Sequence, residues 1–178
     1  MNEPMKAAME QAAGGFRLPR YGEITDVGLY LEQTIRFING YLAPFNGLAL
    51  TPSMLSNYVK QRIVAPPVKK LYGADQIASL FFIAVAKAVM SLEDIRLLFM
   101  VQKGSYPLPT AFDYFCAELE NVLQFKFGLK ARLDDIGKTQ SEAKVLLRNV
   151  IIAVVDKLYL DQYVQALRGA QAKEETKE

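Results

Sequence analysis

The side chains that most often carry out catalysis are scarce in this sequence. It contains no histidine, which excludes Ser-His-Asp and Cys-His catalysis and most zinc sites. The one cysteine, Cys116, lies beside Phe112, Tyr114 and Phe115, a setting more typical of an inert buried thiol than of a nucleophile. No glycine-rich phosphate-binding loop occurs. We therefore expect no enzyme, no metal site and no cofactor.

Carboxylates remain as candidates for acid–base chemistry. They occur in adjacent pairs such as Glu93 with Asp94 and Asp134 with Asp135. Neighbouring residues on a helix diverge by about 100°, so the two members of a pair do not face one substrate together. Solvated helix surface is the favoured interpretation of both pairs.

A second chemical feature is a long stretch without acidic residues. No aspartate or glutamate lies between Glu32 and Asp75. The basic residues inside this stretch are Arg36, Lys60, Arg62, Lys69 and Lys70. The net charge of the whole chain is only +2, so the local positive charge is not visible in the composition. Cations of this kind neutralise the phosphates of a nucleic-acid backbone.

The middle of this stretch predicts a short helix with one polar face. Thr51 is a typical N-cap, and Pro52 suits the first helical position. Leu55 and Val59 are expected to point inward. The polar face then carries Ser53, Ser56, Asn57 and Lys60. Small hydroxyl and amide side chains read base edges in DNA, asparagine being suited to adenine, but on charge alone a solvated surface helix is an equally good interpretation.

The elements that must position this short helix are themselves mostly helices. Spacings of three and four predict a helix over about 28–41, with Asp26 as N-cap. Its apolar stripe comprises Leu31, Ile35, Ile38 and Leu42. Prolines at 66 and 67 forbid helix, and residues 68–72, which combine apolar with basic side chains, are interpreted as strand-like. Further helices are predicted over 74–89, from an N-cap at Ser91, over 109–127 and over 141–167, with a loop over 103–109.

Nothing in the sequence indicates a membrane or an exported protein. The apolar run over residues 150–155 is far shorter than the roughly 20 residues that a membrane span needs. The first 15 residues lack the continuous apolar core of a secretory signal. We expect a cytoplasmic protein without membrane association.

The order of the elements resembles the mercury-resistance-regulator (MerR) type of winged helix-turn-helix. That family runs, loosely, from a reading helix with "TLRYYE" through a "GLLPPP" turn and a wing ending in "GYRxY" to a helix opening with "SL[ED]EI". The resemblance covers about residues 48–99. Its matching residues are Tyr58, Pro66, Pro67, Tyr72 and the "SLEDI" of 91–95. Ser56 and Asn57 replace the Arg-Tyr pair, Arg62 stands where a glycine usually turns the chain, and Lys70 takes the place of the wing arginine.

The whole chain also resembles an uncharacterised bacterial family of unknown function that is classed with helix-turn-helix proteins. Members of that family join an upstream "R-Y-x-E…D-x-x-L-Y-x-x-Q" pattern to the same core. In this sequence the pattern is formed by Arg20, Tyr21, Glu23, Asp26, Leu29, Tyr30 and Gln33.

These resemblances imply an all-α, DNA-binding transcription regulator. The implied base contacts are Ser53, Ser56 and Asn57. The implied backbone contacts are Thr51, Tyr58, Lys60, Arg62, Lys69, Lys70 and Tyr72. Residues 1–19 would be a flexible arm, 20–100 the helix-turn-helix region with its preceding helix, 101–169 a C-terminal helical region, and 170–178 a disordered tail. The partner would be double-stranded DNA, bound at a pseudo-palindrome by a homodimer formed through the C-terminal helices.

Two alternatives remain open at this point. In the first, the helix-turn-helix is only a packing motif and the C-terminal helices form an interface with another protein. In the second, the C-terminal bundle senses a small molecule in an apolar pocket lined by Phe112, Phe115, Tyr159 and Tyr163. Aromatic residues at helical spacing are far more often core than pocket. The sequence does not reveal an effector, a target site or the sign of regulation.

Overall fold

The apolar periodicity of the sequence gives seven α-helices within the residues that the structure describes, 3–137 and 141–175. In this computed structural model they are α1 (Glu3–Gly14), α2 (Leu31–Leu42), α3 (Pro52–Lys60), α4 (Ala74–Ala86), α5 (Leu92–Ser105), α6 (Leu108–Lys126) and α7 (Glu142–Glu175). Two short 3-10 helices, η1 (Tyr21–Glu23) and η2 (Asn46–Leu48), lie in the connections. Extended pairing in these ranges is limited to the isolated bridges Leu29–Tyr72 and Val68–Leu71. The expected all-α class is confirmed.

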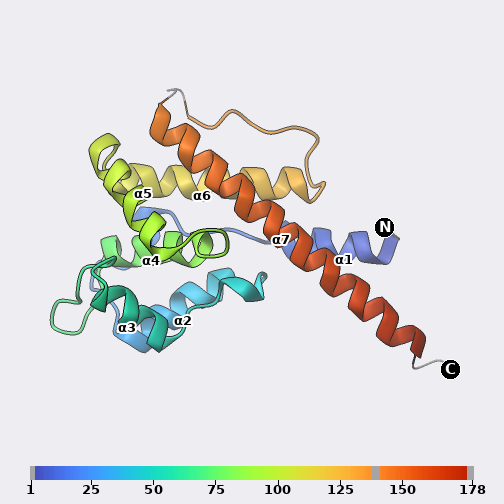
Figure 1. Ribbon diagram of the computed structural model, residues 1–178, viewed down its shortest axis with the longest axis horizontal. Coiled ribbons are helices and arrows are strands. Elements are labelled where there is room, and N and C mark those ends of the chain that lie inside the picture. Colours follow the sequence, from blue (N-terminus) through green and yellow to red (C-terminus); the bar gives the residue numbers. More distant parts are fainter. Residues whose placement is uncertain (1–2, 138–140, 176–178) are drawn as a thin grey trace.

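Helix α4 lies in the middle of the fold (Figure 1), because its sequence is apolar on almost every face. Its buried residues are Ile77, Ala78, Leu80, Phe81, Ile83, Ala84, Val85 and Ala86. The centroid of the Phe81 ring lies 6.0 Å from that of Phe37 on α2 and 6.0 Å from that of Phe112 on α6. Burying one such side chain stabilises the fold by about 1.5–3 kcal/mol. The buried helix predicted over 74–89 is confirmed, although it ends at Ala86.

Helices α6 and α7 pack along each other and cover the side of α4 that faces away from α2 (Figure 1). The buried side of α7 carries Val150, Ile151, Val154, Val155 and Leu158. Ser141 caps this helix, since its Oγ accepts a hydrogen bond from the backbone N–H of Lys144 at 3.2 Å. Residues 170–175, predicted as part of a disordered tail, are helical because they are mostly good helix formers. The rest of that tail, 176–178, lies outside the described residues.

The N-terminal segment is a helix where the sequence predicts a flexible arm over 1–19. Met9 and Ala13, one turn apart on α1, are buried where this helix packs against α7. After the helix, the ring of Phe16 packs edge-on against Phe45 with 5.3 Å between centroids, and Leu18 is fully buried. The apolar face of α1 therefore holds the segment on the bundle. Residues 1–2 lie outside the described part of the chain.

Helix α2 begins at Leu31 rather than at Gly28, and Asp26 does not cap it. Gly28 has a φ of +73°, and Leu29 pairs with Tyr72, so the chain stays extended up to this point. The N-terminus is instead capped by Gln33, whose Oε1 accepts the backbone N–H of Tyr30 at 2.9 Å. The predicted stripe is confirmed at Ile35, Ile38 and Leu42, which are buried, while Leu31 is half-buried.

Helix α5 is longer than the sequence suggests, so the loop predicted over 103–109 is shorter. Its predicted N-cap is confirmed, because the Oγ of Ser91 accepts the backbone N–H of Asp94 at 3.1 Å. At the other end, the side chain of Gln102 donates to the carbonyl of Tyr106 at 2.6 Å and closes the last turn. The helix then gives way to α6 at Pro107, which cannot continue it.

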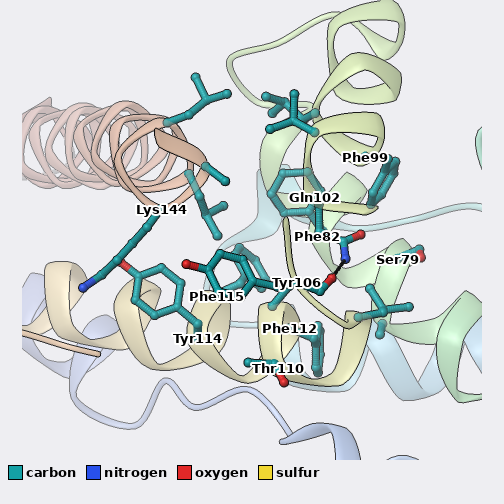
Figure 2. A pocket seen from close by; sticks show the side chains of 18 of the residues that line it. Ser79, Phe82, Phe99, Gln102, Tyr106, Thr110, Phe112, Tyr114, Phe115 and Lys144 are labelled. Atoms are coloured by element: carbon teal, nitrogen blue, oxygen red, sulfur yellow. Dashed lines mark hydrogen bonds between the residues drawn. The ribbon is translucent and has the colours of Figure 1, made fainter. Parts of the chain in front are cut away.

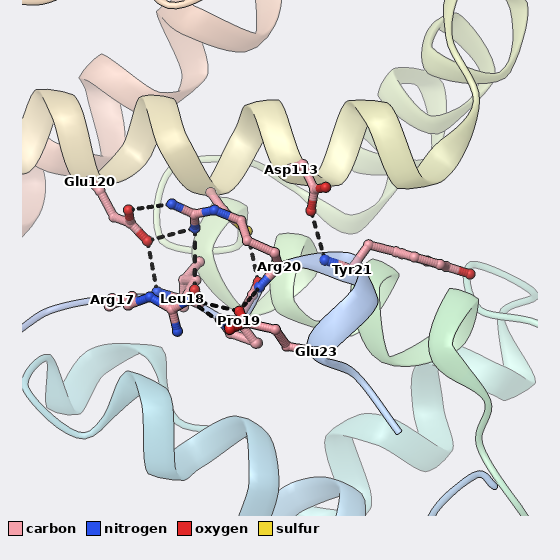
Figure 3. A network of polar contacts seen from close by, with 9 residues as sticks. Arg17, Leu18, Pro19, Arg20, Tyr21, Glu23, Asp113 and Glu120 are labelled. Atoms are coloured by element: carbon pink, nitrogen blue, oxygen red, sulfur yellow. Dashed lines mark hydrogen bonds and ion pairs between the residues drawn. The ribbon is translucent and has the colours of Figure 1, made fainter. Parts of the chain in front are cut away.

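Arginine 20 and its neighbours clamp the segment before α2 to helix α6 (Figure 3). The two terminal nitrogens of Arg20 donate to the two carboxylate oxygens of Glu120 at 2.8 and 2.6 Å. The same carboxylate accepts the backbone N–H of Leu18 at 2.9 Å, and Asp113 accepts that of Tyr21 at 2.7 Å. The Tyr21 hydroxyl also donates to Asp75 at the start of α4. The upstream "R-Y-x-E" pattern is therefore used to join α6 and α4.

Replacing Arg20 should weaken the fold substantially. We expect Arg20→Met to lower the free energy of unfolding by about 2–3 kcal/mol, because it leaves a largely buried Glu120 carboxylate without its two charge-assisted hydrogen bonds. Urea unfolding followed by circular dichroism measures this loss.

The matched control is Arg17→Met, a change of the same residue type in the same segment. Arg17 pairs with Glu23, and both side chains are about half exposed, at 53% and 46%. An exposed pair contributes only about 0.2–1 kcal/mol. Equal losses in the two variants would show that the Arg20 clamp does not hold the segment.

Candidate nucleic-acid interface

The turn between α2 and α3 is pinned from two sides. The side-chain amide of Asn39 on α2 accepts the backbone N–H of Leu50 at 2.8 Å and donates to its carbonyl at 2.9 Å. From the end of α4, the ammonium of Lys87 donates to the carbonyls of Gly47 and Ala49, both at 3.3 Å. Burial lowers the pKa of Lys87. These bonds fix how α3 is presented relative to the rest of the bundle.

Helix α3 has the cap and the polar face that the sequence predicts. Thr51 Oγ1 accepts the backbone N–H of Met54 at 3.3 Å, and Pro52 occupies the first position. The exposed side chains on one face are Ser53, Ser56, Asn57 and Lys60. Leu55 and Tyr58 anchor the opposite face in the core, whereas Val59, expected to point inward, is only half-buried.

Arg62 ends this helix in the left-handed backbone region, with a φ of 57°. Its N–H bonds to the carbonyl of Val59, and the N–H of Ile63 bonds to that of Tyr58, both at 3.0 Å. This is the Schellman arrangement, which normally places glycine at the position of Arg62. A side chain with a Cβ costs about 1–2 kcal/mol in this conformation.

A tight hairpin with a basic tip follows the two prolines. Val68 and Leu71 exchange both backbone hydrogen bonds, at 3.0 and 2.9 Å. Lys69 and Lys70 between them have φ values of 50° and 69°. Two consecutive positive φ values define a type I′ turn, for which Asn-Gly is strongly preferred over any pair of lysines. The stretch predicted as strand-like over 68–72 is therefore a hairpin with a two-residue turn, and Val68–Leu71 is the bridge that closes this turn.

The base of the hairpin is hydrogen-bonded to the segment just before α2 and to α4. Leu29 and Tyr72 exchange backbone hydrogen bonds at 2.9 and 2.8 Å. The side chain of Gln76 on α4 donates to the carbonyls of Ala65 at 2.9 Å and Pro66 at 2.8 Å. The unfavourable turn is thus held from both of its ends.

The cations of the acid-free stretch are exposed and have no acidic partner. Within the described residues, no ion pair involves Arg36, Lys60, Arg62, Lys69 or Lys70. Elsewhere in the same part of the chain, Arg20, Lys126 and Arg148 each pair with a carboxylate. Every non-glycine residue with positive φ in that part is one of these unpaired cations: Arg62, Lys69 and Lys70. Backbone strain of this kind collects at functional sites.

Two of the predicted DNA-backbone contacts, Tyr58 and Tyr72, lie in the hydrophobic core. The side chains of Tyr58 and Tyr72 are only 3% and 5% exposed and belong to the hydrophobic core. Burial raises the pKa of both phenols. Their rings support α3 and the hairpin from inside, while Thr51 is exposed but engaged as the helix cap.

Sequence analysis did not identify three amide side chains that support α3 and the hairpin, namely those of Gln61, Asn39 and Gln76. Gln61 Nε2 donates to Asn57 Oδ1 at 3.1 Å, which leaves the amide nitrogen of Asn57 facing solvent. Their spacing of four residues on one helix is a signal that could have indicated this pair. Asn39 and Gln76 bind backbone groups at a distance in the sequence, and no local pattern marks them.

Other possible sites carry little chemistry. Cys116 is fully buried and donates to the carbonyl of Pro19 at 3.4 Å, and burial raises the pKa of its thiol. Over residues 3–137 and 141–175, no cluster of three or more metal-ligating side chains is found. None of the helices described is both long and apolar enough to cross a membrane.

A family model described as "Domain of unknown function (DUF1836)" matches residues 19–115, more than half of the 178-residue chain. The match includes Arg20 but not its partner Glu120, together with α2, α3, the hairpin, α4, α5 and the first part of α6. Neither a curated protein nor a solved structure matches the chain.

Replacing Arg62 by glycine should stabilise the protein. We expect Arg62→Gly to raise the free energy of unfolding by about 1 kcal/mol, because glycine adopts the left-handed conformation without a steric cost. The control, Arg36→Gly within α2, should lower it by about 1 kcal/mol, since glycine is unfavourable inside a helix. Urea unfolding of both variants tests the pair, and a loss of stability in Arg62→Gly contradicts the conformational cost inferred for Arg62.

Proposed function

We propose that this chain, which belongs to the family of unknown function DUF1836, is a DNA-binding transcription regulator. Helices α2 and α3 form its helix-turn-helix, and the hairpin around Lys69 and Lys70 is a short wing of the MerR type. The observation that carries the proposal is the set of unpaired cations that flank α3 in backbone conformations that glycine or asparagine would adopt more easily.

The dimensions and position of α3 suit a DNA groove. Its nine residues span about 14 Å, and the major groove of DNA is about 12 Å wide. Figure 1 shows α3 and the hairpin at the edge of the bundle, on the side away from α6 and α7. This edge is the one that we propose to face the duplex.

In this arrangement α3 reads bases and the surrounding cations hold the backbone. Ser53, Ser56 and Asn57 lie on the face that enters the groove. The amide of Asn57 forms two hydrogen bonds to adenine once Gln61 releases its oxygen, an exchange between exposed groups. The backbone contacts from exposed side chains are Lys60, Arg62, Lys69 and Lys70, with Thr51 at the helix start.

The wing can be tested by a variant that improves the turn while removing its charge. We expect Lys69→Asn/Lys70→Gly to raise the free energy of unfolding by about 1–2 kcal/mol, since Asn-Gly is the favoured type I′ pair. The same variant should bind all duplex sequences more weakly. The negative slope of log affinity against log salt should become shallower by about 2. Urea unfolding measures the stability. Fluorescence anisotropy with random duplex DNA and with the region upstream of the protein's own gene measures the affinity and its salt dependence.

The control removes two cations elsewhere. Arg96 and Lys103 on α5 are exposed, have no ion pair in the described part of the chain, and lie apart from α3 (Figure 1). Arg96→Ala/Lys103→Ala should leave the affinity and salt slope unchanged. An equal loss in both variants would indicate a nonspecific charge effect and contradict the wing assignment.

The regulator is proposed to act as a homodimer through α7. The last turns of this helix extend beyond the bundle (Figure 1), and its second half exposes an apolar stripe at spacings of four and three. Its members are Leu160 at 59%, Val164 at 42% and Leu167 at 42% exposure. A second copy packed on this stripe would present two α3 helices to a pseudo-palindromic site.

Charging the stripe should separate the dimer without unfolding the monomer. We expect Leu160→Lys/Leu167→Lys to sediment as a monomer and to bind the preferred DNA site at least tenfold more weakly. Leu97→Lys/Met100→Lys on α5 is the matched control, because these side chains are equally exposed. Sedimentation velocity at several concentrations distinguishes the two, and a wild-type monomer at micromolar concentration contradicts the dimer proposal.

A protein-interaction module is the alternative function. The exposed Leu97, Met100 and Val101 of α5 favour it, because apolar side chains gathered on one surface often mark protein contacts. Absence of DNA binding by the wild-type protein at low salt, together with a partner captured in stoichiometric amount, would support this alternative over the regulator.

A further inference from the structure

Helices α4, α5, α6 and α7 surround an apolar cavity of about 270 Å³ (Figure 2). The sequence suggested a pocket lined by four aromatic residues. Phe112 and Phe115 do line the cavity. Tyr159 and Tyr163 lie elsewhere on α7, where Tyr159 packs edge-on against Phe127 with 5.3 Å between centroids. The cavity is thus formed by a different set of residues from the one predicted.

One wall of the cavity is a continuous row of phenylalanine rings. Phe82 of α4 lies edge-on to Phe99 of α5 and to Phe115 of α6, with 5.5 and 5.3 Å between centroids. Phe112 extends the row, 6.2 Å from Phe115. Rings in such a row attract a further ring in an offset or edge-on orientation. The wall therefore favours an aromatic ligand over an aliphatic one.

Small side chains leave the space open, and its mouth reaches the surface. The small lining residues are Ala78, Ser79, Ala111 and Ala143. Val101 of α5 and Leu146 of α7 also line the cavity and are 42% and 37% exposed. A ligand can thus enter between α5 and α7.

The lining gives no reason to expect a charged ligand. Lys144 is the one charged side chain among the described residues that line the cavity. Its ammonium donates to the carbonyl of Gly137 at 2.9 Å and lies 5.4 Å from the ring centroid of Tyr114. It is therefore already engaged at one end of the site, and the remaining lining is almost entirely apolar.

We propose that this cavity is a binding site for a small, uncharged aromatic molecule of about two rings. An apolar cavity of about 150 Å³ holds one benzene, so a space of about 270 Å³ suits a molecule roughly twice that size. This inference does not rest on the proposed DNA binding.

The test uses 1-aminonaphthalene, an uncharged two-ring aromatic dye whose emission shifts to shorter wavelength in apolar sites. The chain has no tryptophan, so the protein itself does not contribute in the dye's spectral range. We expect saturable binding of one dye per chain, displacement by naphthalene, and a rise of the melting temperature with dye concentration.

Filling the cavity should abolish this binding. Ala143→Leu and, independently, Ala111→Leu place a larger side chain in the space from α7 and from α6. Each should weaken dye binding at least tenfold without lowering the melting temperature, and circular dichroism verifies that the variants are folded. Ala153→Leu, on the exposed side of α7, is the matched control and should bind the dye like the wild type.

Two results would overturn the proposal. One is dye binding that is absent, unsaturable, or unchanged in both filled variants while these remain folded. The other is dye binding that weakens as the protein concentration rises, which would show that a second copy of the chain covers the mouth. Failure of DNA binding affects neither result.

Discussion

The burial of α4 on most of its sides is the constraint on which the other elements depend. A 13-residue helix without a polar face must be surrounded, and α2, α5, α6 and α7 each cover part of it. Because α4 starts two residues after Tyr72, its position also fixes the bridge between Tyr72 and Leu29 and hence the start of α2. Its far end places Lys87 under the turn that precedes α3. The exposed short helix is thus oriented by a helix that has almost no contact with water.

The same helix links the two sites inferred from the structure. Its first turn supplies Gln76, which holds the carbonyls before the hairpin, and Asp75, which binds Tyr21 of the clamped segment. One turn further on, Ser79 and Phe82 face the apolar cavity. The clamp at Arg20 ties this arrangement to α6, which also lines the cavity. The basic edge and the cavity therefore share one rigid element rather than lying on independent parts of the chain.

The local features of the fold could be predicted from the sequence, and the long-range ones could not. The caps at Thr51 and Ser91 and the stripe of α2 follow from neighbouring residues, and all are present. The Arg20–Glu120 clamp joins residues 100 positions apart, and nothing near either residue identifies its partner. The docking of α1 depends on a surface of α7 that exists only after folding. For the site, the exposed face of α3 was predictable, whereas the burial of Tyr58 and Tyr72 depended on how α3 and the hairpin pack.

Charge alone leaves α3 equally well explained as a solvated surface helix or as a DNA-reading helix, and the proposal of DNA reading rests on backbone geometry. If α3 and the hairpin formed only a solvated surface, replacing Arg62, Lys69 or Lys70 by glycine or asparagine would remove no favourable interaction. Such replacements would also relieve unfavourable φ values. The bonds from Gln76 and from the Leu29–Tyr72 bridge are what hold the lysine turn in place. Arg62, Lys69 and Lys70 are each expected to lower stability relative to glycine or asparagine, so their presence calls for an explanation outside the folded state. The proposed binding to a polyanion would supply one, because each of these cations is exposed and has no carboxylate partner in the described part of the chain.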